Sequence, residues 1–212
     1  MFKIFILLFG IIYFHNAQST TSYNGAWWGT FVKKQTSKRN AIWAETQIRY
    51  NLDFGAMAQF LYRTGLLRSY QNQHEMGLLY GFIQGSSSKE HRFALQHVKS
   101  YGKLLNFDWS TRTRLEHRLF EDNDTTSQRF RFLLRAQKPV SSNYNLAIWN
   151  ELFLNLSNDH LSGNTTTDRN RFFIGLNQSY HQSKFEFGYL NQYVPRSEQN
   201  TMEHLLVVYL FI

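Results

Sequence analysis

Arginine recurs at every second position in several segments of this chain, a spacing that can build a network of ion pairs or an anion site. Arg112 and Arg114 alternate with apolar residues, and Arg129 and Arg131 repeat the pattern in the next segment. The guanidinium group is planar and donates paired hydrogen bonds to carboxylates and phosphates. Eleven arginines hold such positions: Arg49, Arg63, Arg92, Arg112, Arg114, Arg118, Arg129, Arg131, Arg135, Arg169 and Arg171.

Fewer acidic residues than arginines share these positions, namely Glu45, Glu75, Glu90, Asp108, Glu116, Glu151 and Glu186. If both sets are enclosed, two interpretations stay open. The preferred one is a structural Arg–Glu network that fills the interior. The alternative is a narrow channel whose basic surplus selects small anionic solutes, as rings of charge do in pores. The candidate lining residues are the eleven arginines together with Glu116, Glu151 and Glu186.

The residues between the arginines are apolar, and this two-residue period predicts β-strands. Phe130 and Phe132 alternate with Arg129 and Arg131. Side chains of a strand point to alternate faces, whereas a helix with its period of 3.6 would scatter the arginines around its circumference. The same test predicts ten strands: Ala41–Leu52, Ala58–Leu67, Gln73–Ile83, Glu90–Ser100, Phe107–Leu119, 129–137, Tyr144–Leu156, Arg169–Tyr180, Lys184–Tyr193 and Thr201–Ile212.

These strands have the length of membrane-spanning strands. A transmembrane β-strand needs about 9–11 residues, whereas strands of soluble proteins are commonly about 5–6 residues long. In a membrane barrel the apolar face contacts lipid, where an arginine at mid-depth costs about 2–4 kcal/mol, so the arginines must point inward. We therefore predict an all-β, antiparallel transmembrane barrel over residues 41–212. A soluble β-sandwich is the alternative architecture.

The number of strands is less well determined by the sequence. The segment Asn24–Lys33 carries Trp27, Trp28 and Phe31 and is either a first strand or a plug, within an N-terminal segment 18–40. Bacterial barrels generally have an even number of strands. The prediction is therefore a barrel of about 10–12 strands, with ten or twelve preferred.

The first residues have the order of a secretory signal peptide. Lys3 precedes an unbroken apolar run, and the small residue Ala17 follows a polar step. That run is too short for a membrane helix of about 20 residues. We predict a signal peptide over residues 1–17, cleaved on export, and a location in a bacterial outer membrane. A retained N-terminal anchor is the alternative.

Other functional classes find little support in the residues. The net charge of +8 could indicate nucleic-acid binding, but arginines that face an interior form no exposed basic patch. His181 and Ser183 have the spacing of a His–Ser pair in outer-membrane lipid hydrolases, yet they lie in a predicted tight turn, so a lipid hydrolase is the least favoured function. We predict no enzyme, no cofactor and no metal site.

The expected partners follow from the location. They are outer-membrane lipid and, during insertion, the barrel assembly machinery, which reads an apolar terminal strand such as Tyr209–Ile212.

Several motifs in order along the chain resemble the outer-membrane barrels catalogued as domain of unknown function 2490. The resemblance implies the fold and the location and carries no established activity. The motifs are Arg63-Thr64-Gly65-Leu66, Glu90-His91-Arg92, residues 112–118, residues 129–139, residues 150–155, Asp168-Arg169-Asn170-Arg171 and residues 188–192.

Overall fold

The computed structural model describes residues 20–212 except 87, 123–124 and 158–165, so the predicted signal peptide 1–17 and its cleavage site lie outside the described residues. The described chain is almost entirely β-structure, and none of its helices is long and apolar enough to cross a membrane. Its elements are β1 (Thr20–Gln35), β2 (Asn40–Asn51), β3 (Ala56–Tyr70), the short 3₁₀ helix η2 (Gln71–Gln73), β4 (His74–Gly85), β5 (Lys89–Leu104), β6 (Phe107–Phe120), β7 (Thr126–Pro139), β8 (Tyr144–Asn155), β9 (Thr167–Tyr180), β10 (Ser183–Val194) and β11 (Asn200–Phe211).

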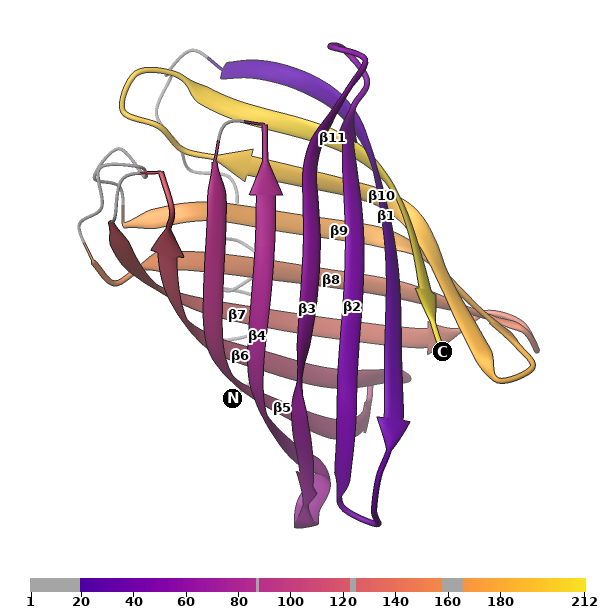
Figure 1. Ribbon diagram of the computed structural model, residues 1–212. Coiled ribbons are helices and arrows are strands. Elements are labelled where there is room, and N and C mark those ends of the chain that lie inside the picture. Colours follow the sequence, from indigo (N-terminus) through magenta and orange to yellow (C-terminus); the bar gives the residue numbers. More distant parts are fainter. Residues whose placement is uncertain (1–19, 87, 123–124, 158–165) are drawn as a thin grey trace.

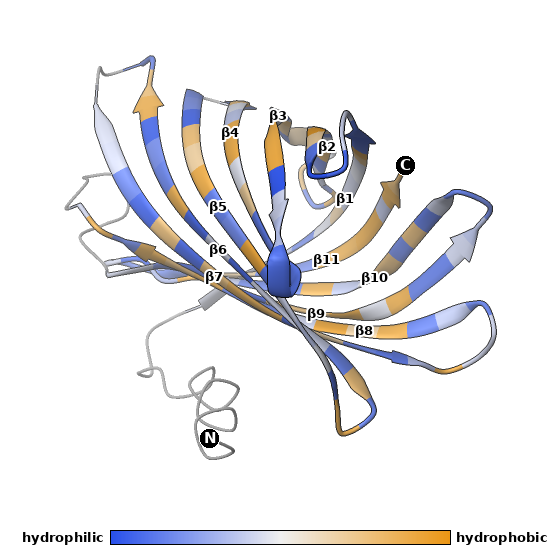
Figure 2. Ribbon diagram, turned by 90° about the horizontal axis from the view of Figure 1, so that it is seen from below, coloured by the Kyte–Doolittle hydropathy of each residue, from blue (hydrophilic) through white to orange (hydrophobic). Residues whose placement is uncertain are grey.

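The ten strands predicted from the alternation are all present, and the segment Asn24–Lys33 forms the middle of β1. Burial follows the predicted parity. In β7, Arg129 and Arg131 are buried while Phe130 and Phe132 are partly exposed on the outer face. The same banding of hydrophilic and hydrophobic residues runs along most ribbons in Figure 2. In strands such as β7, local alternation therefore determines which face turns inward.

The strands form one closed barrel in which each strand pairs antiparallel with the next, and β1 pairs with β11 in parallel. The parallel register runs from Thr20 opposite Asn200 to Phe31 opposite Phe211. Among the described residues the barrel has eleven strands, which confirms the predicted range of about 10–12, although the preference for ten or twelve is wrong. An odd number makes the first and last strands run in the same direction, and closure then requires a parallel pair. The segment 24–33 is thus part of the wall and not a plug.

In the view of Figure 1, β1–β5 cross β6–β10 at a large angle. The tight connections 36–39, 71–73, 105–106, 140–143 and 181–182 share one end with the C-terminus, which we call the turn end. The connections 52–55, 86–88, 121–125, 156–166 and 195–199 share the other end, which we call the loop end.

An apolar cluster occupies part of the interior. Trp27 and Phe31 of β1 pack with residues of β7 to β11, including Trp149, Phe173 and Tyr209. The rings of Trp149 and Phe173 are stacked with centroids 5.0 Å apart. Large inward side chains from β1 and from β7 to β11 therefore fill space that an open pore would leave to water.

Two glycines that pair across β9 and β10 make room for this stack. Gly175 lies opposite Gly188, and a Cβ at Gly175 would collide with the Phe187 carbonyl oxygen and with the ring of Phe173. We expect Gly175→Ala to lower the free energy of unfolding by about 1–3 kcal/mol, the usual cost of overpacking. Urea unfolding in detergent micelles, followed by tryptophan fluorescence, measures it.

Gly81→Ala in β4 is the matched control. The nearest atom to a Cβ at Gly81 is the Tyr62 carbonyl oxygen at 3.5 Å, an ordinary contact. An equal loss of stability in both variants would contradict the packing explanation, because it would point to a general effect of alanine in these strands.

Candidate functional site

The interior encloses a cavity of about 480 Å³ that extends from loop-end residues such as Ser88 and Arg196 to Phe31 and Phe211 near the turn end. All eleven arginines singled out in the sequence line this cavity, as do Glu151 and Glu186. Glu116 is 1% exposed and reaches the same charged cluster through its ion pairs. The barrel thus brings together arginines that lie as far as 122 positions apart in the chain, from Arg49 to Arg171.

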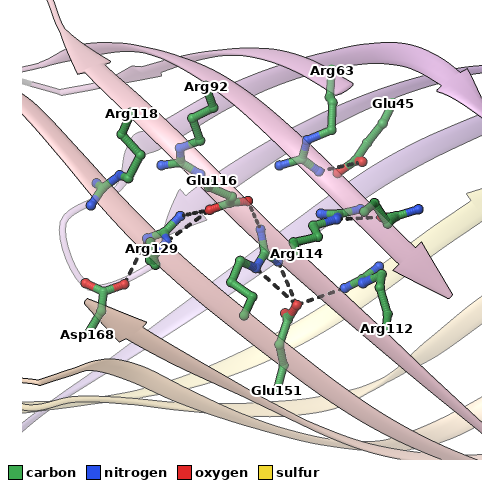
Figure 3. Close-up of polar contacts among 12 residues, drawn as sticks. Glu45, Arg63, Arg92, Arg112, Arg114, Glu116, Arg118, Arg129, Glu151 and Asp168 are labelled. Carbon is green, nitrogen blue, oxygen red and sulfur yellow. Dashed lines mark hydrogen bonds and ion pairs between the residues drawn. The ribbon is translucent and has the colours of Figure 1, made fainter. Parts of the chain in front are cut away.

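Glu116 of β6 is held by two arginines of the neighbouring strand β7 (Figure 3). Arg129 donates from Nε at 3.0 Å and from Nη2 at 2.6 Å to one carboxylate oxygen, and Arg131 donates from Nη1 at 2.7 Å to the other. Arg129 also donates to Asp168 of β9 at 2.8 Å. Each of these groups is buried. Their charge-assisted hydrogen bonds form a continuous chain that joins β6, β7 and β9.

Glu151 of β8 is the second centre of the network. Its Oε1 accepts from Arg112 at 2.9 Å and from Arg131 at 2.8 and 3.2 Å, and its Oε2 lies 3.8 Å from Arg171. A single carboxylate therefore serves three guanidinium groups. Glu116 and Glu151 share Arg131, so the two centres form one unit.

Three further carboxylates hold single arginines or pairs. Their partners come from the sequence-predicted set: Glu45 accepts from Arg63 at 2.7 Å, Glu90 accepts from Arg118 at 2.7 Å and also from Arg92, and Glu186 accepts from Arg135. Glu186 in addition accepts from the indole N–H of Trp149 at 3.3 Å. Two other acids of the predicted parity lie elsewhere, since Glu75 pairs with Lys33 and Asp108 is exposed.

One buried acid of the network was missed at the sequence level. Asp168 is 3% exposed and bonds to Arg129 and Arg169, although it lies beside Arg169 in the chain and so has the opposite parity. The pairing of β8 with β9 shifts register at Phe153 and Leu154, opposite this position. Such a bulge changes the alternation locally, so parity alone assigns Asp168 to the wrong face.

Two aromatic side chains complete the site. The ring of Phe153, 1% exposed, has the guanidinium carbons of Arg131, Arg171 and Arg129 at 4.4, 4.6 and 5.1 Å from its centroid. The indole ring of Trp27 has those of Arg49 and Arg171 at 4.0 and 4.8 Å. Cation–π attraction of this kind steadies arginines without neutralising their charge.

Residues considered for other chemistry are not assembled into a site. His181 lies in the β9–β10 turn with a φ of 52° and packs edge-on against Tyr180, and Ser183 begins β10. Among the residues that the structure describes, no group of three or more His, Asp or Glu side chains is placed to hold a metal ion.

A closed, almost entirely antiparallel barrel with a charged interior is porin-like in architecture. The solved structure described as "NanC porin structure in rhombohedral crystal form" is similar, with a TM-score of 0.51 and 8% sequence identity over 77% of this chain and 78% of that chain. The chain belongs to the family described as Protein of unknown function (DUF2490), whose model matches residues 24–203. No curated protein matches the chain.

Proposed function

We propose that the protein is a bacterial outer-membrane barrel whose interior is held closed by a structural network of arginines and carboxylates. The observation that carries the proposal is the linked pair Glu116 and Glu151, both at most 2% exposed, which joins β6, β7, β8 and β9 through shared arginines. Side chains of this network and the apolar cluster occupy the lumen. The remaining cavity of about 480 Å³ has the volume of a small-molecule pocket rather than that of an aqueous channel.

The outer face supports a membrane location. Leu66, Leu78, Leu95 and Leu206 are each more than half exposed, and they lie on the outer parity of β3, β4, β5 and β11. Contiguous apolar surface of this extent is unusual on a soluble monomer and marks contact with lipid or protein. Membership of the family carries no activity with it, and the predicted signal peptide would supply the export route.

The remaining parts of the proposal follow from this location. Outer-membrane lipid surrounds the barrel, and the barrel assembly machinery recognises the apolar strand β11. We place the loop end outside, because the external loops of such barrels are generally longer and 156–166 is the longest connection. No catalytic role is proposed.

The first test is electrical. We expect the purified protein, folded in detergent and added to planar bilayers, to give no steady conductance of porin size. In the same preparation the unboiled protein should migrate differently from the boiled protein on a denaturing gel, because a folded barrel resists detergent until it is heated. Absence of that gel shift would contradict the barrel itself.

A narrow channel for small anions is the second candidate. The basic surplus of the lining, with eleven predicted arginines and fewer carboxylates, favours it. A steady conductance with a reversal potential that shows anion selectivity in a salt gradient would support the channel and overturn the closed interior.

A further inference from the structure

The positive surplus of the interior is concentrated at arginines that are bonded to glutamines. Arg49 bonds to Gln47 and Gln59, and Arg114 bonds to Gln96. Neither arginine has a carboxylate within ion-pair distance among the described residues, whereas Arg129 and Arg131 each have two. A glutamine has the length of a glutamate, so it orients a guanidinium group in the same way while leaving its charge uncompensated.

Arg49 has a buried donor that no described residue accepts. Its Nη1 donates to Gln59 at 2.6 Å and its Nη2 donates to Gln47 at 3.1 Å, and both acceptors are neutral amide oxygens. Its Nε is buried and has no hydrogen-bond partner among the described residues. Arg49 and Gln59 both line the cavity. A buried, unmet donor on a cation is costly, and an anion in the cavity would remove that cost.

Arg171 of β9 lies near Arg49 of β2, against the same ring of β1. It is 7% exposed, its Nε donates to Gln192 at 2.7 Å, and its nearest carboxylate oxygen, on Glu151, is 3.8 Å away. Gln192 in turn donates to Glu203, so a second carboxylate contacts this glutamine and not Arg171 itself. Both guanidinium groups pack on the Trp27 ring, at 4.0 Å for Arg49 and 4.8 Å for Arg171. Two positively charged groups therefore pack on the same neutral indole ring next to the cavity.

We propose that the cavity binds a small oxyanion, a carboxylate or a phosphate, with Arg49 and Arg171 as its principal ligands. Guanidinium groups match the paired oxygens of both anions. Gln47 and Gln59 keep Arg49 in place and leave its charge for the ligand, whereas Arg171 shares Glu151 with Arg112 and Arg131. The inference deepens the proposed function, because it assigns a ligand class to the closed interior.

The decisive variant supplies the missing carboxylate from the protein itself. Gln59→Glu places a negative charge where the amide oxygen now accepts from Arg49, with almost no change in shape. The control Gln71→Glu adds the same charge in the exposed turn η2 at the turn end, away from Arg49. The folded protein in detergent micelles, free of other oxyanions, is titrated by calorimetry with inorganic phosphate and separately with acetate.

We expect phosphate, acetate or both to bind the wild-type protein and the Gln71→Glu control equally. Gln59→Glu should weaken that binding about tenfold or more, as the loss of one charge-assisted contact requires. The pair of titrations identifies the ligand: phosphate alone indicates a phosphoryl group, and acetate alone indicates a carboxylate.

Two results would overturn the site: no heat of binding with either anion, or unchanged affinity in Gln59→Glu. If Gln59→Glu fails to show the gel shift of a folded barrel, Arg49→Gln replaces it, with the same expected loss of binding. The titration needs no bilayer, so a negative result leaves the conductance test of the closed barrel unaffected, and the two proposals can fail separately.

Discussion

Glutamine in place of Glu116 is expected to lower the free energy of unfolding by about 3–5 kcal/mol, the largest effect among the charged residues. The side chain is 1% exposed and accepts hydrogen bonds from Arg129 and Arg131. Removing its charge leaves these two buried guanidinium groups with only Asp168 and Glu151 to neutralise them. Unfolding by urea in micelles, followed by tryptophan fluorescence, gives the change directly.

A double-mutant cycle separates the network from a simple loss of packing. The double variant Glu116→Gln with Arg129→Met should lose less free energy of unfolding than the two single variants together. The second change removes one of the two guanidinium groups that lose their Glu116 partner. Glu75→Gln is the control for an isolated and partly exposed pair, since its partner Lys33 is 37% exposed, and we expect a loss of about 1 kcal/mol or less. Equal losses for Glu116→Gln and Glu75→Gln would refute a cooperative network.

Phe153→Ala should have a comparable effect, a loss of about 3–5 kcal/mol. The ring is 1% exposed and lies among the guanidinium groups of Arg129, Arg131 and Arg171. Its removal creates a cavity and also brings the repelling cations into contact with water or with one another. The same unfolding measurement applies, together with the temperature at which the folded band disappears from the gel.

Phe153→Leu distinguishes the two causes. Leucine restores most of the apolar volume but offers no π-face to the cations. If the ring acts through the arginines, Phe153→Leu should still lose about 1–2 kcal/mol. Full recovery of stability in Phe153→Leu would show that the ring only fills space.

The fold could be predicted from the sequence to the level of individual strands, because the alternation of apolar residues and arginines is a local property. The segments around Arg112 and Arg131 show this most clearly, and both form strands with the arginines inside. The N-terminal segment could not be assigned in this way. Trp27 and Trp28 make both of its faces aromatic, so its parity gives no sign of which face is inside, and only closure against β11 makes it a wall strand.

The composition of the site was predictable only in part. Parity identifies Arg49, Arg114 and Arg171 as inward residues, but it does not tell them from arginines that have a carboxylate partner. Asp168 escaped the same reasoning because a register shift lies opposite it. A glutamine such as Gln59 has no distinctive pattern in the sequence, because its role depends on the charged group that it contacts in the folded protein.

Taken alone, the sequence determined which residues form strands and which side chains turn inward, since both depend on neighbours two positions apart. The tertiary structure decided the odd strand number, the parallel pairing of β1 with β11, and which of the eleven arginines obtain a carboxylate. The physical reason is that ion pairs such as Arg129 with Asp168, and shared rings such as Trp27 between Arg49 and Arg171, join strands that only register and closure bring together.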